Sequence, residues 1–211
     1  MLASEAVPPF AIVLLALLGG ATPPKRPNMP VGWTWPPSFA MRAAGEECLG
    51  RLDAAGVDHR PGSATKKIAT PVVLPTMQIG ALVLTPRKGT GPHPMDCQLA
   101  AGLAELAPAL VALGVRGLQF RTLHEYRMVR KNGRTTNILS RHGIGLAIDV
   151  FGVELDDGTV LEIEDDWQGA PVLAAIVAVF AASPRFRTPL SPGNDLRNHA
   201  DHVHLEAHLR I

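Results

Sequence analysis

The segment SRHGIGLAIDVFGV, residues 140–153, contains two potential metal ligands, His142 and Asp149, the second of them among apolar residues. Its second half, Leu146–Val153, is typical of a strand, with Asp149 inside it and His142 on the turn before it. A carboxylate in an apolar strand needs a partner, and a metal ion supplies one. The two glycines that follow His142 would let the backbone approach such an ion closely. The segment therefore predicts a metal site at the start of a strand.

A second segment, NHADHVHLE at residues 198–206, offers further ligands in His199, Asp201, His202 and His204. Imidazole nitrogen and carboxylate oxygen are zinc ligands, and a catalytic zinc keeps three protein ligands and one open position. His202 and His204 have the spacing of a strand, so their side chains point to one face. Asp201 has the opposite parity and is a candidate for orienting an imidazole. Together the segments predict a mononuclear zinc site, with a metal-free polar cluster as the alternative.

Helices and strands are expected on both sides of these segments, without regular strand–helix alternation. The apolar spacing predicts helices over residues 46–55, 96–113 and 171–182. Extended segments are expected over residues 68–84, 115–123, 146–153, 159–163 and 202–206. The turn-like Asp156-Asp157-Gly158 predicts that 146–153 and 159–163 form a hairpin. Pro108 should kink or interrupt the second helix, and Gly114 is placed to stop it. This order predicts an α+β fold, an antiparallel sheet with flanking helices.

The length of 211 residues fits one domain, or one domain with appendages. Hydrophobic residues make up 46%, enough for a core, and the net charge of +1 gives no argument for nucleic acid as a partner. Basic residues gather before or at the edge of the first segment, either as a solvated face or to hold an anionic substrate or a carboxylate near the metal. They are Arg121, Arg127, Arg130, Lys131, Arg134 and Arg141.

The N-terminal region predicts export to the periplasm or cell envelope. Phe10–Ala21 is apolar and ends in small residues, as the apolar region of a signal peptide does. It is shorter than the run of about 20 apolar residues that a membrane-spanning helix needs. No Lys or Arg precedes it, so residues 1–21 are expected to be a signal peptide or a membrane anchor, with no other span. Residues 22–45 are rich in proline and predict a linker to a domain over residues 46–211.

Cys48 and Cys97 are the two cysteines of the chain. In an exported protein an even number of cysteines favours a disulfide. Two buried free thiols are the alternative. Neither cysteine lies near the histidine segments in sequence, so neither is a favoured metal ligand.

The histidine segments resemble those of a known group of metallopeptidases. The shared pattern is Ser140-x-His142-x-x-Gly145-x-Ala147-x-Asp149, followed by His202-x-His204. It resembles the superfamily of zinc D-Ala-D-Ala carboxypeptidases, D,D-dipeptidases and the Hedgehog signalling domain, which implies a fold of that type. LGVRGLQFRTLHEY, Asp166-Trp167 and HADHVHLE are most similar to the bacterial extensin-like C-terminal domain family, over residues 46–211.

The resemblance implies a zinc ion bound by His142, Asp149 and His204, with His202 beside the bound water as the acid/base group. Arg127, which follows a tyrosine, resembles the arginine that engages a substrate carboxylate or the oxyanion, and Arg130 is near enough to compete. Supporting positions around the ligands are expected for His199, Asp201 and Ser140.

The expected activity is that of a zinc peptidase acting on peptidoglycan peptide stems, of the D,D-carboxypeptidase or endopeptidase type. The alternatives are a non-catalytic zinc-containing wall-binding module and a metal-free structural protein. The chain departs from the family where Met128 and Ser183 replace expected cysteines, and where Arg141 and Gly143 replace an acidic residue and an alanine.

Overall fold

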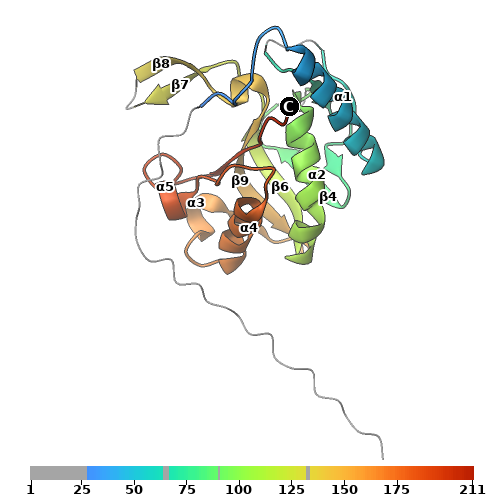
Figure 1. Cartoon of the computed structure of the whole chain (residues 1–211). Coiled ribbons are helices and arrows are strands. Elements are labelled where there is room, and N and C mark those ends of the chain that lie inside the picture. The colour runs from blue at the N-terminus through green and yellow to red at the C-terminus, as the bar shows by residue number, and fades with distance from the viewer. Residues whose placement is uncertain (1–27, 64–66, 90, 132–133) are drawn as a thin grey trace, which may run out of the picture.

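A six-stranded sheet forms the centre of the protein in a computed structural model, which describes residues 28–63, 67–89, 91–131 and 134–211 (Figure 1). The described residues form a mixed α+β structure with mostly antiparallel sheets, so the predicted fold class is confirmed. None of the helices in these ranges is long and apolar enough to span a membrane. The predicted signal peptide or anchor, residues 1–21, lies outside the described residues.

The strands of the sheet follow the order β10-β9-β6-β4-β3, and β11 also pairs with β9. Only β4 and β6 are parallel. The strands are β3 (Gln78–Ile79), β4 (Leu82–Pro86), β6 (Val115–Thr122), β9 (Ala147–Leu155), β10 (Val160–Glu162) and β11 (Val203–Glu206). The extended segments expected from the sequence are all present, and β9 and β10 form the expected hairpin.

Strand β9 is the central element for the site. Along one edge it pairs with β6, and along the other it pairs first with β11 and then with β10. Its first seven residues are buried, which explains why the sequence here is nearly continuously apolar. The one ionisable residue among these seven is Asp149.

The described residues contain five α-helices: α1 (Phe39–Ala54), α2 (Cys97–Ala112), α3 (Ile163–Asp166), α4 (Pro171–Ala182) and α5 (Pro192–Asp195). Figure 1 shows α2 and α4 side by side over the sheet, where both contribute buried residues to the core. Helix α4 has the predicted bounds, with its proline at the first position, where no amide donor is needed.

Two helices differ from expectation. Helix α1 begins at Phe39 rather than at residue 46, because the Ser38 hydroxyl caps it by accepting a hydrogen bond from the Met41 amide at 3.2 Å. Helix α2 runs unbroken through Pro108, so of the two effects predicted for this proline, a kink or an interruption, the interruption does not occur. Pro108 is exposed while Ala107 and Leu110 are buried, and this packing holds the helix together although one hydrogen bond is lost.

Two smaller sheets lie beside the main one. One joins β1 (Arg60–Pro61), β2 (Pro71–Val73) and β5 (Met95–Asp96), and the other is the hairpin of β7 (Met128–Lys131) and β8 (Arg134–Leu139). A disulfide between Cys48 and Cys97 fastens α1 to the start of α2. The predicted disulfide is therefore confirmed, and it indicates folding in an oxidising, extracytoplasmic compartment.

The described end of the proline-rich region lies against the folded chain. Met29 and Trp33 pack on the core. The Asn28 side chain donates a hydrogen bond to the Leu139 carbonyl, and the Asn28 carbonyl accepts one from the Arg141 guanidinium. Residues 28–33 are thus tied to the loop that carries His142.

Candidate metal centre

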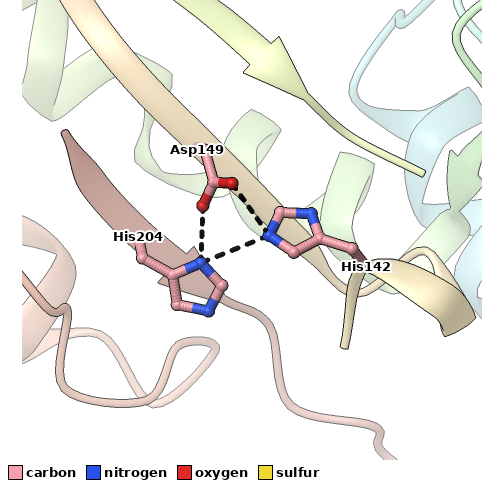
Figure 2. A group of neighbouring side chains, drawn as sticks. All are labelled: His142, Asp149 and His204. Carbon is pink, nitrogen blue, oxygen red and sulfur yellow. Dashed lines mark hydrogen bonds and ion pairs between the residues drawn. The ribbon is translucent and has the colours of Figure 1, made fainter. Parts of the chain in front are cut away.

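Three side chains from three elements meet at the start of β9 (Figure 2). His142 begins the short 3₁₀ helix η1 (His142–Ile144), Asp149 lies in β9, and His204 lies in β11. In the pairing of β9 with β11, His204 is directly opposite Asp149. Opposed residues of antiparallel strands place their side chains on the same face. Sheet register therefore brings together two groups that are far apart in sequence.

The polar atoms of the three side chains converge. His204 Nδ1 lies 2.6 Å from Asp149 Oδ1, and His142 Nε2 lies 3.2 Å from Asp149 Oδ2. The two histidine nitrogens are 3.3 Å apart. His142 is fully buried, and Asp149 is 6% exposed. One potential ligand atom from each residue lies within 4.8 Å of the others, as shared coordination of one ion requires.

The loop before β9 fixes the position of His142. Its backbone amide donates to the Ser140 hydroxyl at 3.3 Å, and Gly145, at φ +71°, ends the 3₁₀ turn. The Leu146 amide donates back to the Arg141 carbonyl at 3.1 Å. Ser140, expected to support the ligands, thus contacts the backbone of His142 and not its ring.

Strand β11 is held on both of its edges. One edge pairs with β9, and the other contacts residues 186–190 through bridges of Phe186 to Ala207 and of Leu190 to His204. The His204 amide donates to the Leu190 carbonyl at 2.8 Å, and the reverse bond is 3.1 Å. The backbone of His204 is therefore fixed before any ion binds.

The orientation of the His142 ring follows from its second nitrogen. His142 Nδ1 lies 3.0 Å from the Leu123 carbonyl oxygen. Because a carbonyl only accepts hydrogen bonds, Nδ1 carries a hydrogen, and Nε2 is the nitrogen that a neutral ring would offer to a metal ion. Ligand histidines in metal sites are commonly fixed in this way.

The electrostatics of the cluster favour positive charge between the rings and the carboxylate. Burial alone would lower the pKa of His204, but its hydrogen bonds to Asp149 and Glu206 raise that pKa to about 9. Burial alone would raise the pKa of Asp149, but hydrogen bonds from His142 and His204 hold it well below its usual range. Without a metal, a proton on His204 supplies the positive charge that a divalent cation would otherwise bring.

His202 lies just before β11 and beside the cluster. Its Nε2 is 3.8 Å from Asp149 Oδ1, and its Nδ1 is 2.7 Å from Asp201 Oδ1. The ring stacks on Phe151 with the centroids 4.9 Å apart. Because the Asp201 carboxylate accepts, Nδ1 carries the hydrogen, and Nε2 faces the cluster with its lone pair.

His199 approaches the same group from the turn after α5. Its Nδ1 is 2.9 Å from Asp195 Oδ2, and its ring centroid is 4.9 Å from that of His202 and 5.7 Å from that of His204. Burial lowers the pKa of His199, and the neighbouring histidines lower it further. A neutral His199 therefore closes one side of the site without adding charge.

The Arg127 side chain pairs with Glu125 and not with the three cluster residues. Its guanidinium forms a 2.9 Å ion pair with Glu125, while its backbone carbonyl accepts from the Ser140 amide. Among the contacts of the described residues, none joins the Arg127 side chain to His142, Asp149 or His204. The side chain of Arg130, the competing arginine in β7, lies outside what the structure describes.

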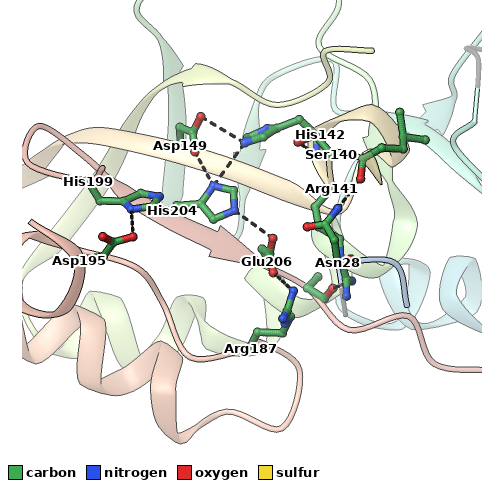
Figure 3. A network of polar contacts seen from close by, with 12 residues as sticks. Asn28, Ser140, Arg141, His142, Asp149, Arg187, Asp195, His199, His204 and Glu206 are labelled. Carbon is green, nitrogen blue, oxygen red and sulfur yellow. Dashed lines mark hydrogen bonds and ion pairs between the residues drawn. The ribbon is translucent and has the colours of Figure 1, made fainter. Parts of the chain in front are cut away.

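The structure adds two residues that received no role from the sequence, Glu206 and Arg187. Glu206 Oε1 lies 3.1 Å from His204 Nε2, and Arg187 forms an ion pair with the same carboxylate (Figure 3). The two-residue spacing of His204 and Glu206 was a usable signal, since it places both on one face of a strand. Arg187 had none, because its position depends on the bridges beside β11.

A cavity of about 260 Å³ adjoins the site, lined by Pro92, His93, Pro94 and residues 121–125. Leu123 belongs to this lining, and its carbonyl is the partner of His142. Arg121 also belongs to it, with its guanidinium 4.0 Å from the Phe151 ring centroid and 4.0 Å from Asp201. A ligand in this cavity would therefore lie beside the positive charge of Arg121.

The donor set fits a zinc ion. Two imidazole nitrogens and one carboxylate oxygen are the ligand number and type of a catalytic zinc, which keeps a fourth position open. The side chains of His204 and His202 are 13% and 16% exposed, so the cluster is shielded but not sealed. The geometry thus defines a mixed α+β protein with a buried His-Asp-His group that could bind a metal.

The comparison with known families agrees with this description. The family described as Extensin-like protein C-terminus matches residues 46–210, so the chain belongs to the extensin-like C-terminal domain family. The matched range contains all three residues of the cluster, and also His202 and Glu206. No curated protein and no solved structure matches the chain.

Proposed function

We propose that this chain is a zinc-dependent peptidase of the cell envelope that acts on peptidoglycan peptide stems, as a D,D-carboxypeptidase or an endopeptidase. The observation that carries the proposal is the convergence of His142, Asp149 and His204 with a fourth group, His202, whose Nε2 lies 3.8 Å from Asp149. The disulfide supports the exported location. The family resemblance supports the substrate class.

The three residues His142, Asp149 and His204 would hold the ion. When bound, zinc supplies a Lewis acid that makes water a usable nucleophile near neutral pH. His202 is arranged to move a proton, because its hydrogen bond to Asp201 leaves Nε2 free to accept one and later to give it to the leaving amine. Stacking on Phe151 limits rotation of the ring during this transfer.

A substrate carboxylate would be held by an arginine at the cavity. Arg127 takes this role by resemblance, and its guanidinium would have to leave Glu125 to do so. Arg121 already lines the cavity, with its guanidinium 4.0 Å from Asp201, the hydrogen-bond partner of His202. Comparison of Arg127→Ala with Arg121→Ala identifies the arginine that binds the carboxylate, since loss of that arginine raises KM for peptides with a free C-terminus.

The test is digestion of muropeptides by the purified chain, with and without a chelator, together with metal analysis. The wild type should contain about one zinc per chain and release product, and His204→Ala should contain none. His202→Ala should keep the metal and lose 10²- to 10⁴-fold in kcat, the range for acid/base groups. His59→Ala, outside the cluster, is the matched control and should change neither.

Two results separate the alternatives. A wild type that binds zinc but releases no product from any peptidoglycan fragment would support a wall-binding module. Zinc content that is unchanged in His204→Ala would reject the ligand set.

A further inference from the structure

Outside the three ligands, one carboxylate contacts a ligand histidine on the side away from Asp149. His204 has two ring nitrogens: Nδ1 faces Asp149 at 2.6 Å, and Nε2 faces Glu206 Oε1 at 3.1 Å. Figure 3 shows this line of contacts from Arg187 through Glu206 and His204 to Asp149. Glu206 follows His204 by two residues on β11, so the strand itself aims both side chains to the same side.

The state of Glu206 is fixed by its surroundings. Its Oε1 faces His204 Nε2, and its Oε2 faces the Arg187 guanidinium. The Arg187 guanidinium forms an ion pair with the Glu206 carboxylate, and both side chains are nearly buried. A second bond joins the two residues, from the Arg187 amide to the Glu206 carbonyl at 2.9 Å. Glu206 is therefore an anchored carboxylate that can only accept hydrogen bonds.

We propose that Glu206, anchored by Arg187, is a positioning residue for the metal centre: it holds the Nε2 hydrogen of His204 and thereby presents Nδ1 to the ion. A neutral imidazole carries one hydrogen, and a carboxylate at Nε2 requires that hydrogen to be there. The Leu123 carbonyl imposes the matching choice on His142, where Nε2 becomes the free nitrogen. Two partners outside the site thus direct two lone pairs to one point.

Charge adds to this geometry. A carboxylate on the far side of a ligand imidazole increases the basicity of the nitrogen that binds the metal, and loss of such a partner typically weakens metal affinity by about 10- to 100-fold. The Arg187 guanidinium offsets part of the negative charge that Glu206 adds beside the site. The inference rests on the proposed metal site but not on hydrolysis.

The experiment measures zinc affinity of the full chain by competition with a chromophoric chelator. Glu206→Leu removes both acceptor and charge and should weaken zinc binding by about 10- to 100-fold. Glu206→Gln keeps an acceptor oxygen for the Nε2 hydrogen but loses the charge, so its loss should be smaller. Because Gln is nearly the same size as Glu, this variant keeps the test usable if Glu206→Leu does not fold.

The matched control is Glu162→Gln. Glu162 also forms an ion pair with an arginine, Arg87 at 2.6 Å, and also lies in a strand that pairs with β9. It contacts none of the cluster residues, so its replacement should leave zinc affinity unchanged. An equal loss in both glutamine variants would mean that the Arg187–Glu206 pair acts only through general stability.

A second measurement reports the ring of His204 directly. In the zinc-loaded wild type, ¹⁵N NMR should show a hydrogen on His204 Nε2 that exchanges slowly with solvent, and in Glu206→Leu that exchange should be fast. Wild-type zinc affinity together with slow exchange in Glu206→Leu would overturn the inference. A wild type that binds no zinc would instead reject the metal centre itself, so the two failures are distinguishable.

Discussion

Gly145 is the residue on which the ligand loop depends most. It lies at φ +71°, a region that favours glycine, between the turn of His142 and the start of β9. A Cβ atom there would lie 2.7 Å from the backbone nitrogen of Asp96, whose amide donates to the Gly145 carbonyl at 2.9 Å. The ligand loop and the start of α2 therefore touch backbone to backbone.

The first prediction concerns Gly145→Ala. The change combines left-handed backbone strain with a backbone clash, so it should lower the free energy of unfolding by about 3 kcal/mol and weaken zinc binding. Gly158→Ala is the control, because Gly158 has φ +85° but open space around its Cβ position. Its cost should be about 1 kcal/mol, with normal zinc content. Denaturant titration and metal analysis measure both; equal costs would contradict the role of the contact.

The candidate ligands of the site could be predicted from the sequence, but the residues that support those ligands could not all be predicted. Residue types and spacing indicated six candidate ligands, the family resemblance implied the set of His142, Asp149 and His204, and the structure brings these three together. Arg187 is invisible to such reasoning, since only the packing of residues 186–190 against β11 places it beside Glu206.

At the scale of the elements, helix α2 is capped at its N-terminus by a buried acidic residue, Asp96. Asp96 is 2% exposed, and its carboxylate accepts hydrogen bonds from the amides of Gln98 at 3.0 Å and Thr70 at 3.1 Å. Burial raises the pKa of Asp96 from 3.8 to about 6, although these bonds oppose the shift. The helix cap therefore titrates in a mildly acidic range.

The second prediction follows from that pKa. The folded chain keeps a proton on Asp96 that the unfolded chain releases near pH 4, so this proton stabilises the fold fully below about pH 4 and the stabilisation is lost as pH rises through about 6. Asp96→Asn has no such titration. Between pH 4 and 7 the wild type should lose on the order of 3 kcal/mol more than the variant.

Denaturant titrations at several pH values measure this difference. Other groups titrate equally in both proteins and cancel. Asp58→Asn, which removes an exposed carboxylate, should follow the wild-type pH dependence. Parallel curves for the wild type and Asp96→Asn would show that Asp96 does not titrate in this range.

Elements with a strong local pattern were predictable, and those set by partners were not. The hairpin of β9 and β10 and the bounds of α4 followed from apolar runs and turn residues. The hairpin of β7 and β8 was missed, because β8 is largely exposed and carries no regular apolar alternation. The early start of α1 was missed because the prolines before it concealed the cap at Ser38.

At the scale of the whole molecule, the disulfide joins α1 to the start of α2 in the core. Cys48 and Cys97 are fully buried and separated by 49 residues. Closing a loop of that length in the unfolded chain stabilises the fold by about 4 kcal/mol in the chain-entropy model. The same bond holds the first residue of α2 in place beside Asp96 and hence near the ligand loop.

The third prediction is that Cys48→Ala/Cys97→Ala lowers the free energy of unfolding by several kcal/mol, about 4 in that model. Because both sulfurs are buried, a reductant should act on the native wild type slowly and on the denatured chain quickly. Thiol titration with time, in buffer and in denaturant, measures this. Rapid reduction of the native protein would show that α1 separates readily from α2 and exposes the disulfide.

The pairing of β9 with β11 also determines when a metal ion can bind during synthesis and export. Asp149 and His204 are 55 residues apart in the chain, so synthesis completes two of the proposed ligands long before the third exists. Two ligands hold a divalent ion far less tightly than three, and an exported chain that crosses a membrane unfolded would carry no ion with it. We expect the metal to be acquired where the last strand docks. The ions available in that compartment, and not those of the cytoplasm, would then decide which metal the protein carries.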